Sequence, residues 1–280
     1  MWWRQELINN LARNGGRDQS GSPKKKIRKR DCLVLTRAFI WAFCLPLLPV
    51  CWLQLKRIRR QPPKMNTATL PVAGARFAST SSAARRVLGL GDQGILGAGD
   101  PDSDLDPGPG LAGYCAEALM RQSDDDTSWQ VAEQGGATVS DLLARCREMD
   151  HLNVDLILIC VGINDVTGLT SLMRWQAGIF DLIFLIRQKG AAKIIFLGLP
   201  PMARFEPLPQ PLRAVCGVRA GLLDAVLKRS VSPLGFAAHL DFETIKPLGI
   251  LTDDGYHLTA PVQKGLGAAA ASLGLRLMET

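Results

Sequence analysis

The sequence has little of what metal sites and disulfide frameworks require. It contains three histidines and seven cysteines, an odd number, and no Cys-x-x-Cys pair. Zinc sites need closely spaced ligand pairs, and disulfide scaffolds need an even set of cysteines. We therefore expect neither kind of site, and we expect most of the cysteines to be buried free thiols.

Negative charge is scarce at the N-terminal end. Residues 1–64 carry 15 Lys and Arg against 3 Asp and Glu, whereas the remaining chain carries 18 and 23. The overall pI of about 9.2 thus reflects the N-terminal segment. Nucleic-acid binding would need basic charge on a folded, aromatic-bearing face, and only 6% of residues are aromatic. We predict no nucleic-acid partner.

An uncharged run at residues 38–55 lies between the basic segments 24–30 and 56–60. Its 18 residues would reach roughly 27 Å as a helix, barely the thickness of a bilayer core, and Pro46 and Pro49 would kink it. Basic flanks suit anionic lipid headgroups. The run predicts membrane association, either as a single span or as an interfacial anchor.

The chain divides into four predicted parts. Residues 1–31 are expected to be a disordered basic segment and residues 32–60 the anchor. A linker rich in Pro, Ser, Thr and Ala is expected at 61–84, and one folded domain at 85–280.

Short apolar runs alternate with helical patterns along the predicted domain. Residues 154–161 are almost continuously apolar, as expected for a strand covered on both faces. The alternation predicts a three-layer α/β/α sandwich with a parallel sheet of about five strands, in which sites lie at the carboxyl ends of strands. The other expected strands are 87–90, 129–132, 193–197 and 237–241, and the expected helices are 111–121, 139–149, 169–188, 212–230 and 261–278.

A glycine-rich segment, Gly89-Leu-Gly91-Asp-Gln-Gly94, follows the first expected strand. It matches the Gly-x-Gly-x-x-Gly dinucleotide fingerprint, which leaves a nucleotide-binding module as an alternative. That fingerprint expects a helix at once and an acidic residue about 20 positions later. Here the chain continues into an Asp-, Pro- and Gly-rich loop, which disfavours this alternative.

Two further motifs follow expected strands. Gly162-Ile-Asn164-Asp comes directly after the central strand, where the amide of Asn164 could donate a hydrogen bond to a developing oxyanion. Asp254-Gly-Tyr-His257 precedes the last helix, and a carboxylate three residues before a histidine can orient the imidazole as a general base. The other two histidines, His151 and His239, are expected to be structural or solvated.

The order of these motifs, with Gly136-Ala-Thr138 between the first two, resembles the SGNH hydrolase family, also called the GDSL lipase/esterase family. The anchor, the basic run, the Pro-rich linker and the stretch 200–213 resemble a bacterial, membrane-anchored branch of that family. The resemblance implies a flavodoxin-like fold, no metal or organic cofactor, and an acyl-ester or lipid-like ligand. It also implies that the Gly136 N–H and Asn164 are oxyanion donors, His257 the base and Asp254 its orienter.

The sequence departs from the family at the nucleophile, because Gln93 stands where the family has serine. A carboxamide has a delocalised nitrogen lone pair and no readily ionisable proton, so it cannot replace the hydroxyl. We therefore predict a protein of esterase ancestry that is inactive or weakened. An active hydrolase using a displaced nucleophile, Ser103 or Thr138, or a water activated by His257 is the alternative.

The alternating carboxylates Asp100, Asp102, Asp104 and Asp106 raise the question of a calcium loop. An EF-hand loop needs glycine at its sixth position and glutamate at its twelfth, which here are Leu105 and Leu111. A solvated acidic loop is the expectation.

Overall fold

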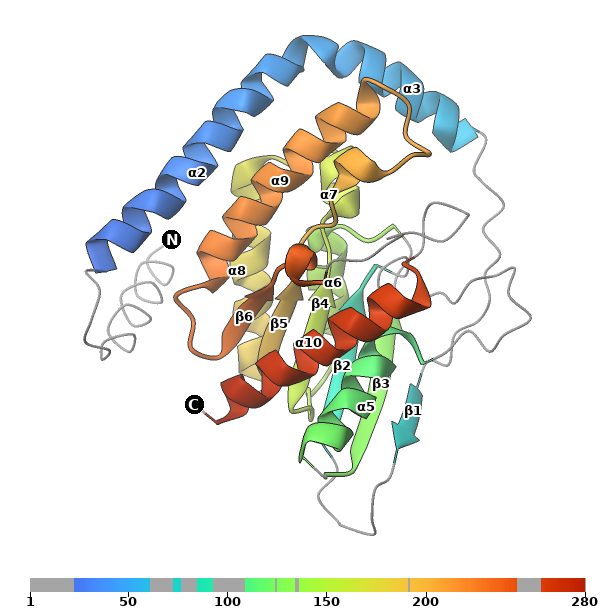
Figure 1. Cartoon of the computed structure of the whole chain (residues 1–280), viewed down its shortest axis with the longest axis vertical. Coiled ribbons are helices and arrows are strands. Elements are labelled where there is room, and N and C mark those ends of the chain that lie inside the picture. Colours follow the sequence, from blue (N-terminus) through green and yellow to red (C-terminus); the bar gives the residue numbers. More distant parts are fainter. Residues whose placement is uncertain are drawn as a thin grey trace.

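A single six-stranded sheet organises the chain in a computed structural model (Figure 1). The strand order is β1-β3-β2-β4-β5-β6, and every pairing is parallel except that of β1 with β3. The structure describes residues 23–60, 73–76, 85–92, 109–123, 125–133, 136–190, 192–245 and 258–279.

Five parallel strands form the predicted central sheet. They are β2 (Arg85–Gly91), β3 (Thr127–Glu133), β4 (Leu156–Cys160), β5 (Lys193–Leu197) and β6 (Ala237–Leu240). All five residues of β4 are buried, which explains its continuously apolar sequence. The antiparallel edge strand β1 (Ala73–Arg76) was not predicted and falls inside the segment expected to be a linker.

Helices cover both faces of the sheet, which confirms the predicted α/β/α sandwich. One layer consists of α5 (Gly110–Ser123) and α10 (Ala260–Met278), which pack on each other. The other layer consists of α6 (Val139–Glu148), α8 (Leu172–Lys189) and α9 (Leu212–Val231). Each layer closes its own apolar cluster against the sheet, with Trp175 in one and Leu266 in the other, both fully buried.

Three short helices lie at the ends of strands. The helix α7 (Ile163–Thr167) follows β4, the 3₁₀ helix η2 (Met202–Arg204) follows β5, and η3 (Phe242–Thr244) follows β6. Apolar periodicity over one turn is too short to predict such elements.

The uncharged run and its basic flanks together form a bent helical arm, made of α2 (Pro23–Cys44), η1 (Leu45–Leu47) and α3 (Leu48–Arg60). The bend falls at Pro46, which lacks an N–H for the helical ladder. Figure 1 shows α2 running along α9 on the outside of the sandwich. Because α2 begins at Pro23, helix extends into the segment 1–31, where disorder is expected; residues 1–22 lie outside the described residues.

Candidate active site

The carboxyl ends of β2 and β4 meet at the centre of the sheet. Gly91 pairs with Cys160, and the Asp92 N–H donates to the Cys160 carbonyl oxygen at 2.9 Å. Gly91 has φ +141°, and a Cβ placed on it would lie 1.9 Å from that same oxygen. Only glycine fits this position, so Gly91 allows the first motif to lie directly against the end of β4.

Asn164 lies in the first turn of α7, immediately beyond β4. Gly162, at φ +126°, turns the chain from the strand into this helix. The Asn164 Nδ2 donates to the Asp92 carboxylate and, at 3.3 Å, to the Ala137 carbonyl oxygen. Three motifs that are far apart in sequence therefore converge on one amide.

Gly136 directly precedes Ala137 and is exposed, at φ +76°. Among the described residues, no atom lies within 4 Å of a Cβ built on it. Ala137 itself is buried, and Thr138 begins α6 as its N-cap. Gly136 and Asn164 are thus brought to the same end of the sheet.

Asp165 was not among the predicted site residues, although the second motif contains it. It is fully buried, and its Oδ2 accepts from the Val139 N–H at 3.0 Å. Burial raises the pKa of Asp165, whereas hydrogen bonds from the Thr170 side chain and the Val139 N–H oppose the shift. Asp165 ties α7 to the start of α6 and so holds Asn164 beside Ala137.

The Thr138 hydroxyl is engaged in a reciprocal capping box. It lies 2.6 Å from Asp141 Oδ2, and the same carboxylate oxygen accepts from the Thr138 N–H at 2.9 Å. The Asp141 N–H points back to the hydroxyl oxygen at 3.4 Å. A hydroxyl held in this way caps a helix and is poorly placed to attack a substrate.

The described cysteines are all free, and five of the six are buried, as expected. Burial raises the pKa of Cys115 to about 12. Cys160 lies beneath the Asp92 backbone, and burial, followed by the charge of Asp92, raises its pKa as well. A thiol kept neutral in this way cannot stand in for the missing serine, because the thiolate is the nucleophile.

The remaining predicted positions lie outside the described residues. These are Gln93, Asp254 and His257, together with Ser103 and the acidic loop 100–106. Within the described ranges, no three His, Cys, Asp or Glu side chains gather as a metal-ligand set.

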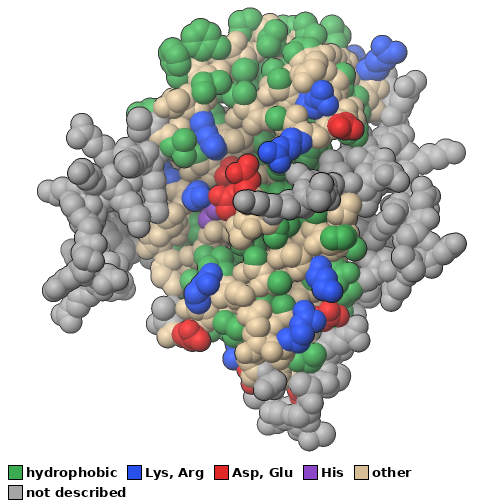
Figure 2. All heavy atoms as spheres, viewed as in Figure 1, with side chains coloured by type: hydrophobic (Ala, Val, Ile, Leu, Met, Phe, Trp, Pro, Cys, Tyr) green, Lys and Arg blue, Asp and Glu red, His purple; other side chains and the backbone are tan. Residues whose placement is uncertain are grey.

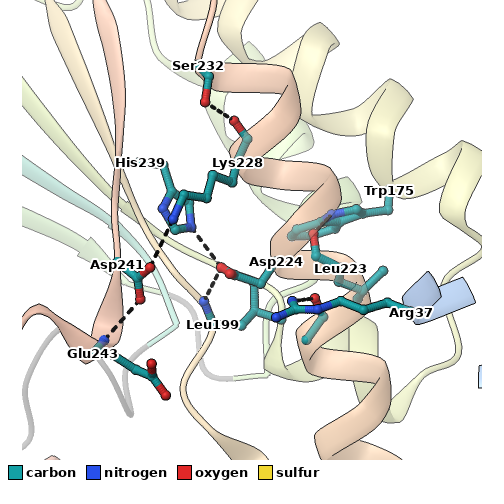
Figure 3. A network of polar contacts seen from close by, with 11 residues as sticks. Arg37, Trp175, Leu199, Leu223, Asp224, Lys228, Ser232, His239, Asp241 and Glu243 are labelled. Atoms are coloured by element: carbon teal, nitrogen blue, oxygen red, sulfur yellow. Dashed lines mark hydrogen bonds and ion pairs between the residues drawn. The ribbon is translucent and has the colours of Figure 1, made fainter. Parts of the chain in front are cut away.

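His239 forms a partly buried pair that belongs to the scaffold. Its side chain is 3% exposed, and its Nε2 lies 2.8 Å from the Asp224 carboxylate, which also accepts from the Leu199 N–H at 3.0 Å. Figure 3 shows Asp224 of α9 between His239 and Leu199. Since β5 separates β6 from β4, this pair lies apart from the Asn164 cluster. His151 is exposed, so both histidines conform to the expectation of structural or solvated residues.

Comparison with known proteins places these motifs in context. The model of the GDSL-like lipase/acylhydrolase family matches residues 90–264. The solved structure of Est24, a carbohydrate acetylesterase from Sinorhizobium meliloti, is similar over 69% of this chain and 99% of its own, at 21% identity and a TM-score of 0.50. The lipase Lip_vut3 from a goat rumen metagenome is similar over 68% and 97%, at 16% identity and a TM-score of 0.53.

At these identities the two structures show a shared fold and nothing finer. No curated protein sequence is significantly similar to the chain.

Proposed function

The chain belongs to the GDSL-like lipase/acylhydrolase family, and we propose that it descends from an acyl-ester hydrolase whose catalysis is lost or greatly weakened at position 93. The observation that carries this proposal is the residue after Asp92. Asp92 lies against β4 with its carboxylate on Asn164, and the next residue is glutamine where the family motif has serine.

The surrounding groups support esterase ancestry. Asn164 and the Gly136 N–H would donate to the oxyanion of a tetrahedral intermediate, and Asp254 would orient His257 as the base. One Asn164 N–H is held by Asp92, while the contact with Ala137 is long at 3.3 Å and could be exchanged for a substrate oxygen. Such donors and binding alone leave roughly 10³–10⁴-fold acceleration over water when a triad member is missing.

The ligand in this proposal is an acyl ester or a lipid-like molecule at a membrane. Within the helical arm, residues 33–58 contain an 18-residue window with a mean hydropathy of 1.9, so this stretch is long and apolar enough by composition to enter a bilayer. A membrane anchor would hold the domain close to lipid esters.

The test is restoration of the serine. The purified full chain and its Gln93→Ser variant are compared on short-chain nitrophenyl esters, with Gln93→Ala as the matched control. We expect kcat/KM to rise at least a hundredfold in Gln93→Ser alone, because only this change supplies a hydroxyl for His257 to activate. Wild-type turnover equal to that of Gln93→Ser would contradict the proposal.

The alternative of a displaced nucleophile at Thr138 is disfavoured by the capping box with Asp141. Ser103 and a water activated by His257 stay open, and an organophosphonate label on the wild-type chain would reveal a serine route. No contact among the described residues favours the nucleotide-binding alternative at Gly89, Gly91 and Gly94.

A further inference from the structure

One stripe of the helical arm packs on the outside of the sandwich. From Trp41 onward its members recur every three or four residues, the spacing of a helix seam, and Val34 lies seven residues, two helical turns, earlier. Cys51 is buried at 4% exposure, and the others are partly buried against the same core cluster that α9 helps to form. The stripe consists of Val34, Trp41, Cys44, Leu48, Cys51, Leu55 and Ile58.

Polar contacts fix the arm at several points. Arg37 of α2 donates to the Gly221 carbonyl oxygen of α9, and Figure 3 shows the Arg37 side chain extending from α2 to α9. The guanidinium of Arg219 lies 4.6 Å from the centre of the Trp41 ring. On α3, the Gln54 side chain bridges the chain just before α9, donating to the Gln210 carbonyl at 2.6 Å and accepting from the Leu212 N–H at 3.1 Å. Polar groups at both ends of the apolar run are thus used by the domain.

The opposite face of the arm is apolar and uncovered. Phe39 and Phe43, stacked edge to face, are 66% and 69% exposed, and Leu53 is 60% exposed. Figure 2 shows hydrophobic side chains gathered at the top of the molecule, where Figure 1 places the bend of the arm. This outer face consists of Leu33, Leu35, Phe39, Ile40, Phe43, Leu45, Leu47, Val50, Trp52 and Leu53.

Leu169 adds an apolar side chain from the family domain. It borders the seam between the arm and the domain together with Trp52 and Leu55, and it is 48% exposed. Its φ of +55° is a left-handed conformation, in which glycine or asparagine is the usual residue. A leucine kept at such a position despite the strain points to a use for its side chain.

The seam itself is too small to hold a lipid chain. It encloses about 50 Å³, room for one or two water molecules. The apolar surface available to a lipid is therefore the outer face, which lies beside the seam.

We infer that the arm lies flat in the surface of an anionic lipid bilayer, with its outer face and Leu169 in the headgroup–acyl boundary and the domain seated above it. The inference rests on the membrane association in the proposed function. Of the two predicted arrangements, a single span and an interfacial anchor, it selects the interfacial anchor. A spanning helix would have to leave α9 and break the contacts of Arg37, Gln54 and Trp41, because the domain cannot follow the stripe into the bilayer.

The charge at the two ends of the arm favours lipid, rather than a second copy of the chain, as the partner that covers the outer face. Both ends of the uncharged run are basic in sequence, at 24–30 and at 56–60. Anionic headgroups complement both ends at once. Two copies packed face to face, in either direction, would place basic ends against basic ends.

The first test measures binding of the full chain to vesicles of phosphatidylglycerol and phosphatidylcholine. We expect binding at least about tenfold tighter than to phosphatidylcholine alone. Phe39→Asp with Phe43→Asp should weaken it about a hundredfold, whereas Ala144→Asp, at an exposed position on α6, should leave it unchanged. Equal binding by all three chains would overturn the inference.

Leu169→Gly introduces a residue that suits the left-handed backbone at this position, so this variant is expected to fold. Removing the left-handed leucine should raise the unfolding midpoint and yet weaken vesicle binding severalfold. Unchanged vesicle binding would show that Leu169 does not contact the lipid, and that part of the inference would be wrong.

Topology separates the flat arm from a span. Epitopes placed before Met1 and after Thr280 should both be cut by protease added outside the vesicles. Protection of one epitope would establish a span and overturn the inference. The inference would also be overturned if the wild-type chain formed a dimer without lipid, Phe43→Asp dissociated that dimer, and neither chain bound vesicles. Esterase assays of Gln93→Ser use soluble esters, so their failure is distinguishable from failure of lipid binding.

Discussion

Gly91 sets how closely the end of β2 approaches β4. We predict that Gly91→Ala destabilises the fold by about 3 kcal/mol or more, because a methyl group would lie 1.9 Å from the Cys160 carbonyl oxygen at a backbone angle that alanine avoids. Urea unfolding measures the change. Gly235→Ala is the control, since no atom of the described residues lies within 4 Å of a Cβ at that turn, and it should stay within about 0.5 kcal/mol of the wild type.

Asn164 is the proposed side-chain donor to the oxyanion. In the Gln93→Ser background, Asn164→Ala should lower kcat by roughly 10²–10³-fold, the usual effect of losing one oxyanion donor. Thr167→Ala, on the same short helix, removes only two long hydroxyl contacts of 3.4 Å and should change kcat less than about twofold. Ester hydrolysis by the two double variants decides the point. Equal losses in both would argue that α7 matters for folding alone.

At the same scale, the sequence predicted the types of residue in the site better than their contacts. Asn164 was expected directly after the central strand and lies there, in the first turn of α7. The bond from Asn164 to Asp92 and the burial of Asp165 were missed. Sequence periodicity describes one element at a time, so it cannot reveal which side chains meet between elements far apart in the chain.

At the scale of elements, the N-terminus of α6 carries a titratable cap. Hydrogen bonds from the Thr138 side chain and N–H lower the pKa of Asp141 below its ordinary value. A carboxyl with a depressed folded pKa contributes stability above its unfolded pKa, about 3.9, and that contribution is lost as pH falls through the lower folded value.

We therefore predict that Asp141→Asn lowers the free energy of unfolding by about 1 kcal/mol at neutral pH, and that its difference from the wild type shrinks below about pH 4. Denaturant unfolding across the acidic range measures this difference. Thr138→Ser retains the hydroxyl and should keep the pH dependence of the wild type. A difference that is constant with pH would show that the carboxylate charge contributes nothing to the cap.

The elements also show where periodicity succeeds. Buried parallel strands such as β4 are almost wholly apolar, so their positions could be predicted within a few residues. The four-residue strand β1 and the five-residue helix α7 have no such signal. The docking of the arm was also missed, because its inner stripe lies within a run that is apolar on every side.

At the scale of the whole molecule, the arm behaves as part of the packed structure. Leu212, Val215 and Cys216 of α9 are buried, and all three line the seam with the arm. A chain that begins at residue 61 would expose them to water. An anchor joined only through a flexible linker would have no such effect on the domain, so truncation distinguishes the two arrangements.

We predict that residues 61–280 alone are less stable than the full chain by on the order of 2–4 kcal/mol and tend to associate, because apolar side chains of α9 lose their cover. Thermal unfolding and sedimentation in mild detergent, which keeps the full chain in solution, measure both effects. Val215→Ser in the truncated chain should reduce association, since it removes part of the newly exposed surface. A truncated chain as stable and monomeric as the full chain would mean that the arm adds nothing to the stability of the domain.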